Sequence, residues 1–177
     1  MGKETHKQPL LDAGNRNRHA LFLQFKSNPD YEDVSFNPTT GGLMATHKGH
    51  NFTKQGGKYE KVVQQVGFNA GNIVILGDER GFDTRHTEGT WNGMLFEVAG
   101  RETATSNNVL KGLKHCASKK TTEVAVLYFP NRFSLEILKN AMNRYKGLKK
   151  LNDGQFLQFK KIICIQAEVI VTEIDMV

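Results

Sequence analysis

The stretch Thr90-Trp91-Asn92-Gly93-Met94-Leu95-Phe96-Glu97-Val98 carries the clearest local signal for the fold of this 177-residue chain. An Asn-Gly pair between two extended segments is typical of a tight β-hairpin, because both turn positions need a positive φ. The residues after the turn are therefore predicted to form a strand. That strand is apolar except for Glu97. A buried carboxylate needs an ion-pair or hydrogen-bond partner, or it has a functional role. Glu97 is the first candidate functional residue.

Helical and extended patterns alternate irregularly on both sides of this hairpin. Apolar residues recur at helical spacing in several segments, and Ser106 or Asn107 is suited to cap one of these helices. The expected helices cover 18–26, 59–66, 106–120 and 135–145, and the expected extended segments cover 31–36, 42–46, 72–76, 123–129 and 162–174. The pattern predicts a single α+β domain over 18–177, with a mixed or antiparallel central sheet and three to four packed helices, after a flexible arm over 1–17.

Composition excludes several classes of protein. Hydrophobic residues make up 38% and charged residues 24% of the chain, as in ordinary globular domains. No apolar run approaches the roughly 18–20 residues of a membrane helix, so we expect a cytoplasmic site of action and no membrane partner. Cys116 and Cys164 are far apart, which argues against a cysteine-based zinc site. The net charge of +6 favours an anionic partner such as nucleic acid.

Two further acidic residues can join Glu97. Glu88 and Glu97 flank the Asn-Gly turn, so their carboxylates can approach one another across the hairpin. Glu60, one helix earlier, can add a third acid. Carboxylates of this kind hold Mg²⁺ in phosphodiester chemistry. The alternative is that Glu60 and Glu88 are ordinary surface charges.

A polar run before the helix that starts near residue 106 suits phosphate binding. Backbone N–H groups at a helix N-terminus favour an anion, and hydroxyl and amide side chains there can orient it. Simple capping of the helix explains the same residues equally well. The candidate residues for substrate contact in this run are Thr103, Thr105, Ser106, Asn107 and Asn108.

Further along the same predicted helix, Lys111 and His115 lie four residues apart and are therefore neighbours. A cation beside an imidazole can stabilise a pentavalent phosphate and transfer a proton, as metal-independent RNA cleavage requires. His47 and Lys48, in an earlier polar loop, are further candidates for substrate contact. His47 and His50 form an H-x-x-H pair, but the sequence places no third metal ligand near them.

The order of these features resembles a known family. It runs from His47-Lys48-Gly49 through Tyr59-Glu60 and the strand 71–76 to Glu88, Gly93 and Glu97, and continues with Thr105 to Asn108 and the strand 123–129. This order resembles the C-terminal RNase toxin domains of contact-dependent growth inhibition proteins and the related nuclease domains of phage head-morphogenesis proteins, within the barnase, EndoU, colicin and RelE-like group. The resemblance covers about residues 42–129.

The resemblance implies cleavage of RNA, with tRNA as the expected substrate, in the cytoplasm of a target cell, and a small immunity protein as partner. The chain departs from the family pattern at one position. The toxin pattern has Glu-x-Lys after the turn, whereas Glu97 is followed by Val98 and Ala99. Either Arg101, Lys111 or His115 supplies the cation, or catalysis has been lost.

Three hypotheses follow. The first is a toxin- or phage-associated ribonuclease that needs no cofactor, with Glu97 and His115 as acid and base and Arg101 and Lys111 as phosphate-stabilising cations. The second is a non-catalytic nucleic-acid-binding or virion-associated protein. The third is a Mg²⁺-dependent DNase of the PD-(D/E)xK kind that uses Glu60, Glu88 and Glu97; the absence of a lysine at position 99 counts against it.

Overall fold

A computed structural model of the protein describes residues 13–54, 57–80, 87–119, 121–132, 134–151 and 159–176, with the backbone alone for residues 13 and 146–151. The helices are α1 (Ala13–Ser27), α2 (Gly57–Asn69), α3 (Ser106–Ser118) and α4 (Leu135–Leu151). The strands are β1 (Tyr31–Phe36), β2 (Leu43–His47), β3 (Ile73–Leu76), β4 (Gly89–Trp91), β5 (Met94–Gly100), β6 (Val124–Phe129), β7 (Lys161–Gln166) and β8 (Val169–Asp175).

The described strands form one mixed sheet in which the spatial order equals the chain order, β1 to β8. The pairs β2–β3, β5–β6 and β6–β7 are parallel, and the other pairs are antiparallel. Each parallel pair is connected through a helix, because parallel neighbours need a crossover that a short turn cannot provide. The predicted α+β fold with a mixed sheet is confirmed.

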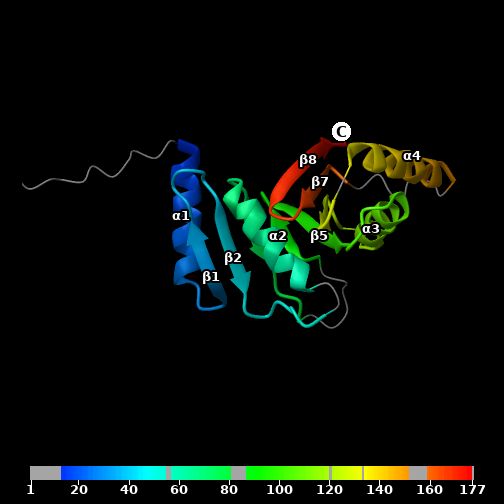
Figure 1. Ribbon diagram of the computed structural model, residues 1–177. Coiled ribbons are helices and arrows are strands. Elements are labelled where there is room, and N and C mark those ends of the chain that lie inside the picture. The colour runs from blue at the N-terminus through cyan, green and yellow to red at the C-terminus, as the bar shows by residue number, and fades with distance from the viewer. Residues whose placement is uncertain are drawn as a thin grey trace, which may run out of the picture.

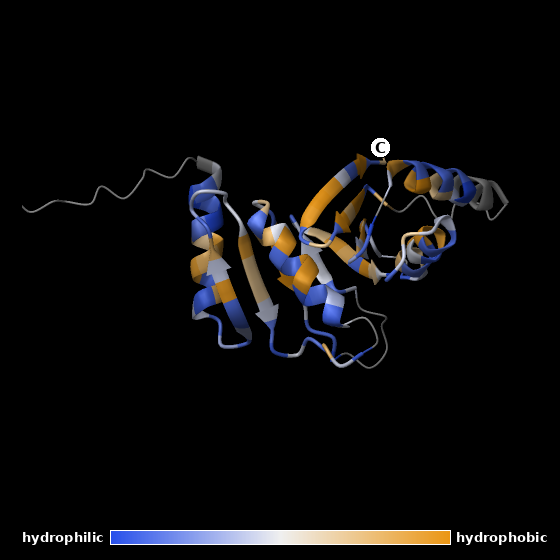
Figure 2. Cartoon of the chain, in the orientation of Figure 1, coloured by the Kyte–Doolittle hydropathy of each residue, from blue (hydrophilic) through white to orange (hydrophobic). Residues whose placement is uncertain are grey.

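Helices cover both faces of the sheet (Figure 1). Along β5, Phe96 and Val98 point to the face that α2 covers, whereas Ala99 points to the face that α3 and α4 cover. Helix α1 packs on β1 and β2 at the far end of the sheet around a separate small cluster that includes Leu43, Ala45 and Ile75. Figure 2 shows apolar residues on the strands and on one side of the helices, with polar residues outside. No described helix is long and apolar enough to cross a membrane.

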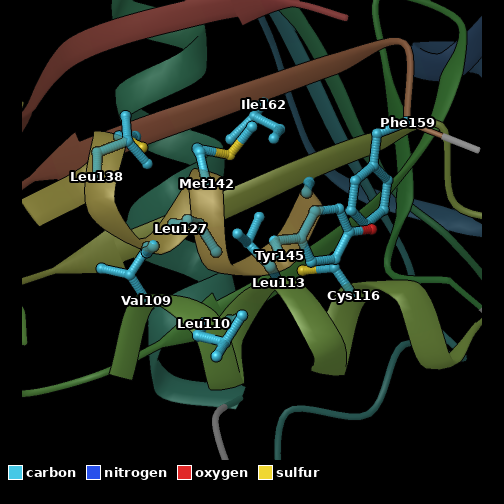
Figure 3. Packing of buried hydrophobic residues seen from close by; sticks show 14 of the residues in the cluster. Val109, Leu110, Leu113, Cys116, Leu127, Leu138, Met142, Tyr145, Phe159 and Ile162 are labelled. Atoms are coloured by element: carbon cyan, nitrogen blue, oxygen red, sulfur yellow. The ribbon is translucent and has the colours of Figure 1, made fainter. Parts of the chain in front are cut away.

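Helix α3 lies unusually close to the sheet. A Cβ at Gly112 would lie 3.0 Å from Leu127 Cδ2 and 3.3 Å from Ala99 Cβ, so this face of the helix has almost no spare room. Leu113, in the next position, is fully buried, and side chains of α3 and α4 interdigitate over the sheet (Figure 3). This close packing fixes the position of the C-terminal end of α3, where two candidate site residues lie.

The hairpin turn has the predicted backbone conformation, with φ of 48° at Asn92 and 82° at Gly93. The first helix begins at Ala13, five residues before the predicted start at residue 18. Residues 13–17 belong to α1 and not to the arm, and Asn15 in this turn donates a hydrogen bond to Pro38 O at 3.0 Å.

Two other boundaries differ from the prediction. The N-cap of α3 is Thr105, whose hydroxyl accepts a hydrogen bond from the backbone N–H of Asn108. The predicted extended segment over 162–174 is two strands, β7 and β8, because the chain turns between them at Ala167, where φ is 52°.

We predict that Leu113→Ala lowers the free energy of unfolding by about 2–5 kcal/mol, because it leaves a cavity where α3 meets the sheet. Urea denaturation measures this change. Leu135, whose side chain is 54% exposed against 0% for Leu113, provides the matched control. Leu135→Ala should change stability by less than about 0.5 kcal/mol. Equal effects of the two substitutions would contradict the packing described for α3.

Candidate active site and metal centre

Four ionisable side chains converge at one end of the sheet, beside the carboxyl ends of β2 and β3. His50 follows β2, Glu60 lies in the first turn of α2, Glu79 follows β3 and Glu88 directly precedes β4. One ligand atom from each residue lies within 4.8 Å of the others. We call these four residues the acidic cluster. They come from four separate segments, which only the pairing of the sheet brings together.

His50 is held rigidly within the acidic cluster. Its Nε2 lies 2.5 Å from Glu60 Oε2, and its Nδ1 lies 2.8 Å from Glu79 Oε1 and 2.9 Å from Gly77 O. Burial disfavours the charged imidazolium, but the hydrogen bonds to Glu60 and Glu79 outweigh it and raise the pKa of His50 to about 9. Burial also opposes the charge of Glu79, but its hydrogen bonds from His50 and Lys54 outweigh burial and lower the pKa of Glu79 to about 2.

The ammonium group of Lys54 lies among the three carboxylates of the acidic cluster. Lys54 Nζ is 2.6 Å from Glu79 Oε2, 2.6 Å from Glu88 Oε2 and 3.2 Å from Glu60 Oε1. Burial opposes its charge, yet these hydrogen bonds raise its pKa above the usual value. Lys54 therefore supplies at this point the positive charge that a metal ion would supply.

The donor set of the acidic cluster fits a divalent cation. Three carboxylates are suitable ligands for Mg²⁺ or Mn²⁺, and an imidazole is compatible with Mn²⁺ and Zn²⁺. The second nitrogen of His50 contacts a carboxylate and a backbone carbonyl, the usual arrangement for a metal-ligating histidine. Binding would require Lys54 to move away from the carboxylates; its side chain is 26% exposed.

A second group of charged residues adjoins the acidic cluster. Glu97, which is 1% exposed, lies with Oε2 2.8 Å from Lys119 Nζ and with Oε1 3.2 Å from His115 Nε2. Lys119 Nζ is also 3.9 Å from Glu88 Oε1. The structure thus brings Glu88 and Glu97 together across the hairpin, as their positions beside the turn predict, and Lys119 bridges them.

Glu88 links the two groups and has a strongly perturbed carboxyl. Burial is the first cause of its shift, and repulsion from the charges of Glu97 and Glu60 adds to it. Together they raise the pKa of Glu88 to about 8, although Lys54 opposes the shift. Perturbed carboxyl groups of this kind concentrate at functional sites.

Lys119 brings an ammonium group to Glu97, although Ala99 stands at the strand position where the family pattern has lysine. Ala99 is buried and faces Gly112, where α3 leaves no room for a long side chain. Lys119 reaches Glu97 from the end of the same helix, where a cation is also favoured by the helix dipole. The sequence predicted a cation at Arg101, Lys111 or His115, and Lys119 was not among the predicted residues.

A cavity of about 510 Å³ opens beside Glu97. Two predicted site residues, Arg101 and His115, lie in its wall. Lys111 lies one turn earlier on α3 and is exposed, and no ion pair among the described residues involves it. The cavity is lined by Lys58, Tyr59, Val98, Ala99, Gly100, Arg101, Glu102 and His115.

The residues predicted to bind phosphate lie at the other end of α3. Asn107 and His115 are eight residues apart, which corresponds to about 12 Å along a helix. Thr105 caps the helix, and Asn108 donates to Thr103 O at 2.8 Å. The side chains of Ser106 and Asn107 accept hydrogen bonds from Arg144 of α4, and Ser106 donates to Asn140. These contacts serve capping and helix packing.

The two early loop candidates lie beside the acidic cluster without joining it. His47 Nδ1 accepts a hydrogen bond from Gly49 N at 3.0 Å and lies 4.0 Å from Asp78 Oδ1. Lys48 is exposed. The residues of the site that the sequence analysis did not select are His50, Lys54, Glu79 and Lys119. For His50, the H-x-x-H spacing was the one available signal.

The chain matches no protein-family model, and no curated protein matches it in sequence. One solved structure, a CdiA-CT/CdiI toxin and immunity complex from Burkholderia pseudomallei, is similar in fold. The identity is 18%, the TM-score is 0.52, and the match covers 71% of this chain and 88% of that chain. This likeness supports a fold like that of CDI toxins.

We predict that stability falls as pH rises from about 4.5 to 8 in the presence of EDTA. The folded-state pKa of Glu88 is about 8, against an ordinary value of 4.5. The folded protein therefore keeps this proton over a range in which the unfolded chain releases it, and that contribution to stability is lost as pH approaches 8. Glu88→Gln should flatten the decline, as measured by urea unfolding at several pH values.

His50 acts in the same direction at higher pH, because its folded-state pKa of about 9 exceeds the ordinary 6.5. Some decline above pH 6.5 should therefore remain in the Glu88→Gln variant. The exposed Glu136, in the first turn of α4, serves as control. Identical pH profiles for wild type, Glu88→Gln and Glu136→Gln would show that Glu88 is not perturbed.

Proposed function

We propose that this chain is a nuclease that cleaves phosphodiester bonds with a divalent cation. The observation that carries the proposal is the acidic cluster of His50, Glu60, Glu79 and Glu88, together with the adjacent Glu97–Lys119 pair. A cation bound by the acidic cluster would polarise a phosphate oxygen and lower the pKa of a bound water. This proposal shares the divalent cation, Glu60 and Glu88 with the Mg²⁺-dependent hypothesis drawn from the sequence, but Glu97 is outside the cation-binding group and His50 and Glu79 join it.

Glu97 and Lys119 have complementary roles in this proposal. In the proposed mechanism, the Glu97 carboxylate, which contacts Lys119 and His115, accepts the proton of the attacking water. The Lys119 ammonium supplies positive charge to offset the negative charge that develops on the oxygens of the pentavalent phosphorus centre. Its distances of 2.8 Å to Glu97 and 3.9 Å to Glu88 place this charge between the two carboxylates.

The proposed substrate is RNA. The family resemblance in the sequence implies RNA, the net charge of +6 suits a polyanion, and the similar fold occurs in a toxin and immunity complex. The proposed place of action is the cytoplasm of a target cell, to which the domain would be delivered. DNA is kept as a test substrate, because a metal-activated water does not need the ribose 2′-hydroxyl.

We predict that the purified protein cleaves RNA with Mg²⁺ or Mn²⁺ and that EDTA abolishes cleavage. Glu60→Gln and Glu88→Gln should each lower the rate at least ~100-fold, because each removes a charged metal ligand. Gel analysis of total RNA and plasmid DNA measures this. Glu136→Gln should retain full activity, and urea unfolding checks that each variant folds. Intact RNA and DNA in every lane would instead favour a non-catalytic nucleic-acid-binding protein.

A second candidate mechanism rests on the Glu97–His115 pair. His115 is 49% exposed, lies 3.2 Å from Glu97 and shares the wall of the cavity with Arg101. An imidazole in this position can take the proton of a ribose 2′-hydroxyl without any metal. Cleavage of RNA but not of DNA that persists in EDTA and is lost in His115→Ala would establish this mechanism in place of the metal-dependent one.

We also propose a small immunity protein as partner, since the similar solved structure is a toxin and immunity complex. The immunity protein is expected to be acidic, because the chain carries a net charge of +6. The test is co-expression with the product of the adjacent reading frame in the source genome. Co-purification and loss of nuclease activity in the complex are expected. Full activity in the presence of that protein would argue against it as the inhibitor.

A further inference from the structure

The cavity beside Glu97 lies where β5 extends past the end of its neighbour. The pairing of β4 with β5 ends at Gly89 and Phe96, and no described strand pairs with residues 98–100 on that side. The first turn of α2 and the last turn of α3 flank this part of β5, and both contribute to the cavity wall. A ligand can therefore contact a strand edge and two helix ends at once.

The cavity wall contains an aromatic ring in a fixed position. Tyr59 packs directly against Gly100, where any Cβ would overlap the ring, and its centroid lies 5.3 Å from that of Tyr128. Its hydroxyl donates a hydrogen bond to Glu102 Oε1 at 2.5 Å. Gly100 and Glu102 thus hold the ring from two directions. Aromatic rings held in this way provide stacking surfaces for nucleobases.

Charged groups of both signs surround the ring. Lys58 Nζ lies over the Tyr59 ring, 4.8 Å from its centroid, and 3.3 Å from Glu102 Oε1, so a base that stacks on this face takes the place of the ammonium group. Arg101 lines the same cavity. Glu102 can accept hydrogen bonds from amino or imino groups, and the two cations can donate to ring nitrogen or carbonyl acceptors. Guanine presents both kinds of group: N1–H and N2–H donors, and O6 and N7 acceptors.

The cavity also adjoins the reacting groups. His115 lies in its wall and is 3.2 Å from Glu97, whose other carboxylate oxygen is 2.8 Å from Lys119. A base bound in the cavity would therefore belong to the nucleotide beside the scissile phosphate. The volume of the cavity, about 510 Å³, falls within the usual range for small-molecule sites.

We propose that this cavity is a guanine-binding subsite, in which the base stacks on Tyr59 and donates hydrogen bonds to Glu102. This inference rests on the proposed nuclease function for its biological meaning, but not for its test. Lys58 and Arg101 contact the acceptors of the base. The subsite makes the nuclease prefer one nucleotide beside the bond that it cleaves, which the acidic cluster alone cannot do.

The test measures binding without cleavage. Wild-type protein in EDTA is titrated with GMP, AMP, CMP, UMP and inorganic phosphate, and affinities are determined by calorimetry. GMP is expected to bind best, and phosphate alone at least about fivefold more weakly, because stacking of one base accounts for about that factor or more. Tyr59→Ala should remove this gain, and Tyr59→Phe should retain most of it.

Glu102→Gln separates base recognition from stacking. It should lower the affinity for GMP more than the affinity for UMP, because guanine presents adjacent N1–H and N2–H donors to the carboxylate, whereas uracil presents a single N3–H donor. Glu136→Gln serves as the matched control, and urea unfolding verifies that each variant folds. Equal affinity for all four nucleotides, or GMP binding unaffected by Tyr59→Ala in a folded variant, would overturn the proposal.

The outcome is distinguishable from that of the cleavage experiment. GMP binding that depends on Tyr59 in a protein that cleaves nothing would leave the subsite standing and remove the nuclease proposal. Metal-dependent cleavage with no base preference in binding would support the nuclease proposal and remove the guanine subsite. A preference for another base, lost in Tyr59→Ala, would keep the stacking role of Tyr59 and contradict the guanine assignment.

Discussion

The mutual repulsion of four carboxylates at one end of the sheet is the constraint on which the site depends. Glu60, Glu88 and Glu97 are almost completely buried, and Glu79 is close to them. Ionised carboxylates at such short range are costly unless cations offset them. Lys54 and His50 neutralise one side, and Lys119 neutralises the other. The raised pKa of Glu88 shows that the compensation is incomplete at the residue between the two sides.

The close packing of α3 explains how one of these cations reaches the site. Gly112 lets the helix approach Ala99 and Leu127, and this approach excludes a long side chain at position 99. The same approach brings the last turn of α3 over Glu97, so that Lys119 can extend back to the carboxylate. An ammonium group thus reaches the Glu97 carboxylate although the sequence lacks the lysine of the Glu-x-Lys pattern. A search for the Glu-x-Lys motif along β5 does not find Lys119, because this residue lies at the end of α3.

The parts of the structure that could be predicted were those governed by local rules. The Asn92-Gly93 hairpin follows from backbone preference, and it places Glu88 beside Glu97. His50 and Glu79 could not be assigned in this way, because they meet only through the parallel pairing of β2 and β3, which local spacing does not encode. The run from Thr103 to Asn108 illustrates the opposite difficulty. Its residue types suit both phosphate binding and helix capping, and the neighbouring α4, which supplies Arg144, decides how Ser106 and Asn107 are used.

The scattering of the site along the chain has a consequence for when chemistry becomes possible. Residues 50 to 119 contribute to it from the segments after β2 and β3, the start of α2, the two strands of the hairpin and the end of α3. No two of these segments meet through local helical contacts, and bringing them together requires long-range strand pairing, which forms late and cooperatively in domains of this kind. An extended chain holds the same residues many residues apart and has no reactive centre. The unfolded polypeptide therefore lacks the proposed catalytic centre, and folding of the sheet is itself the step that assembles it.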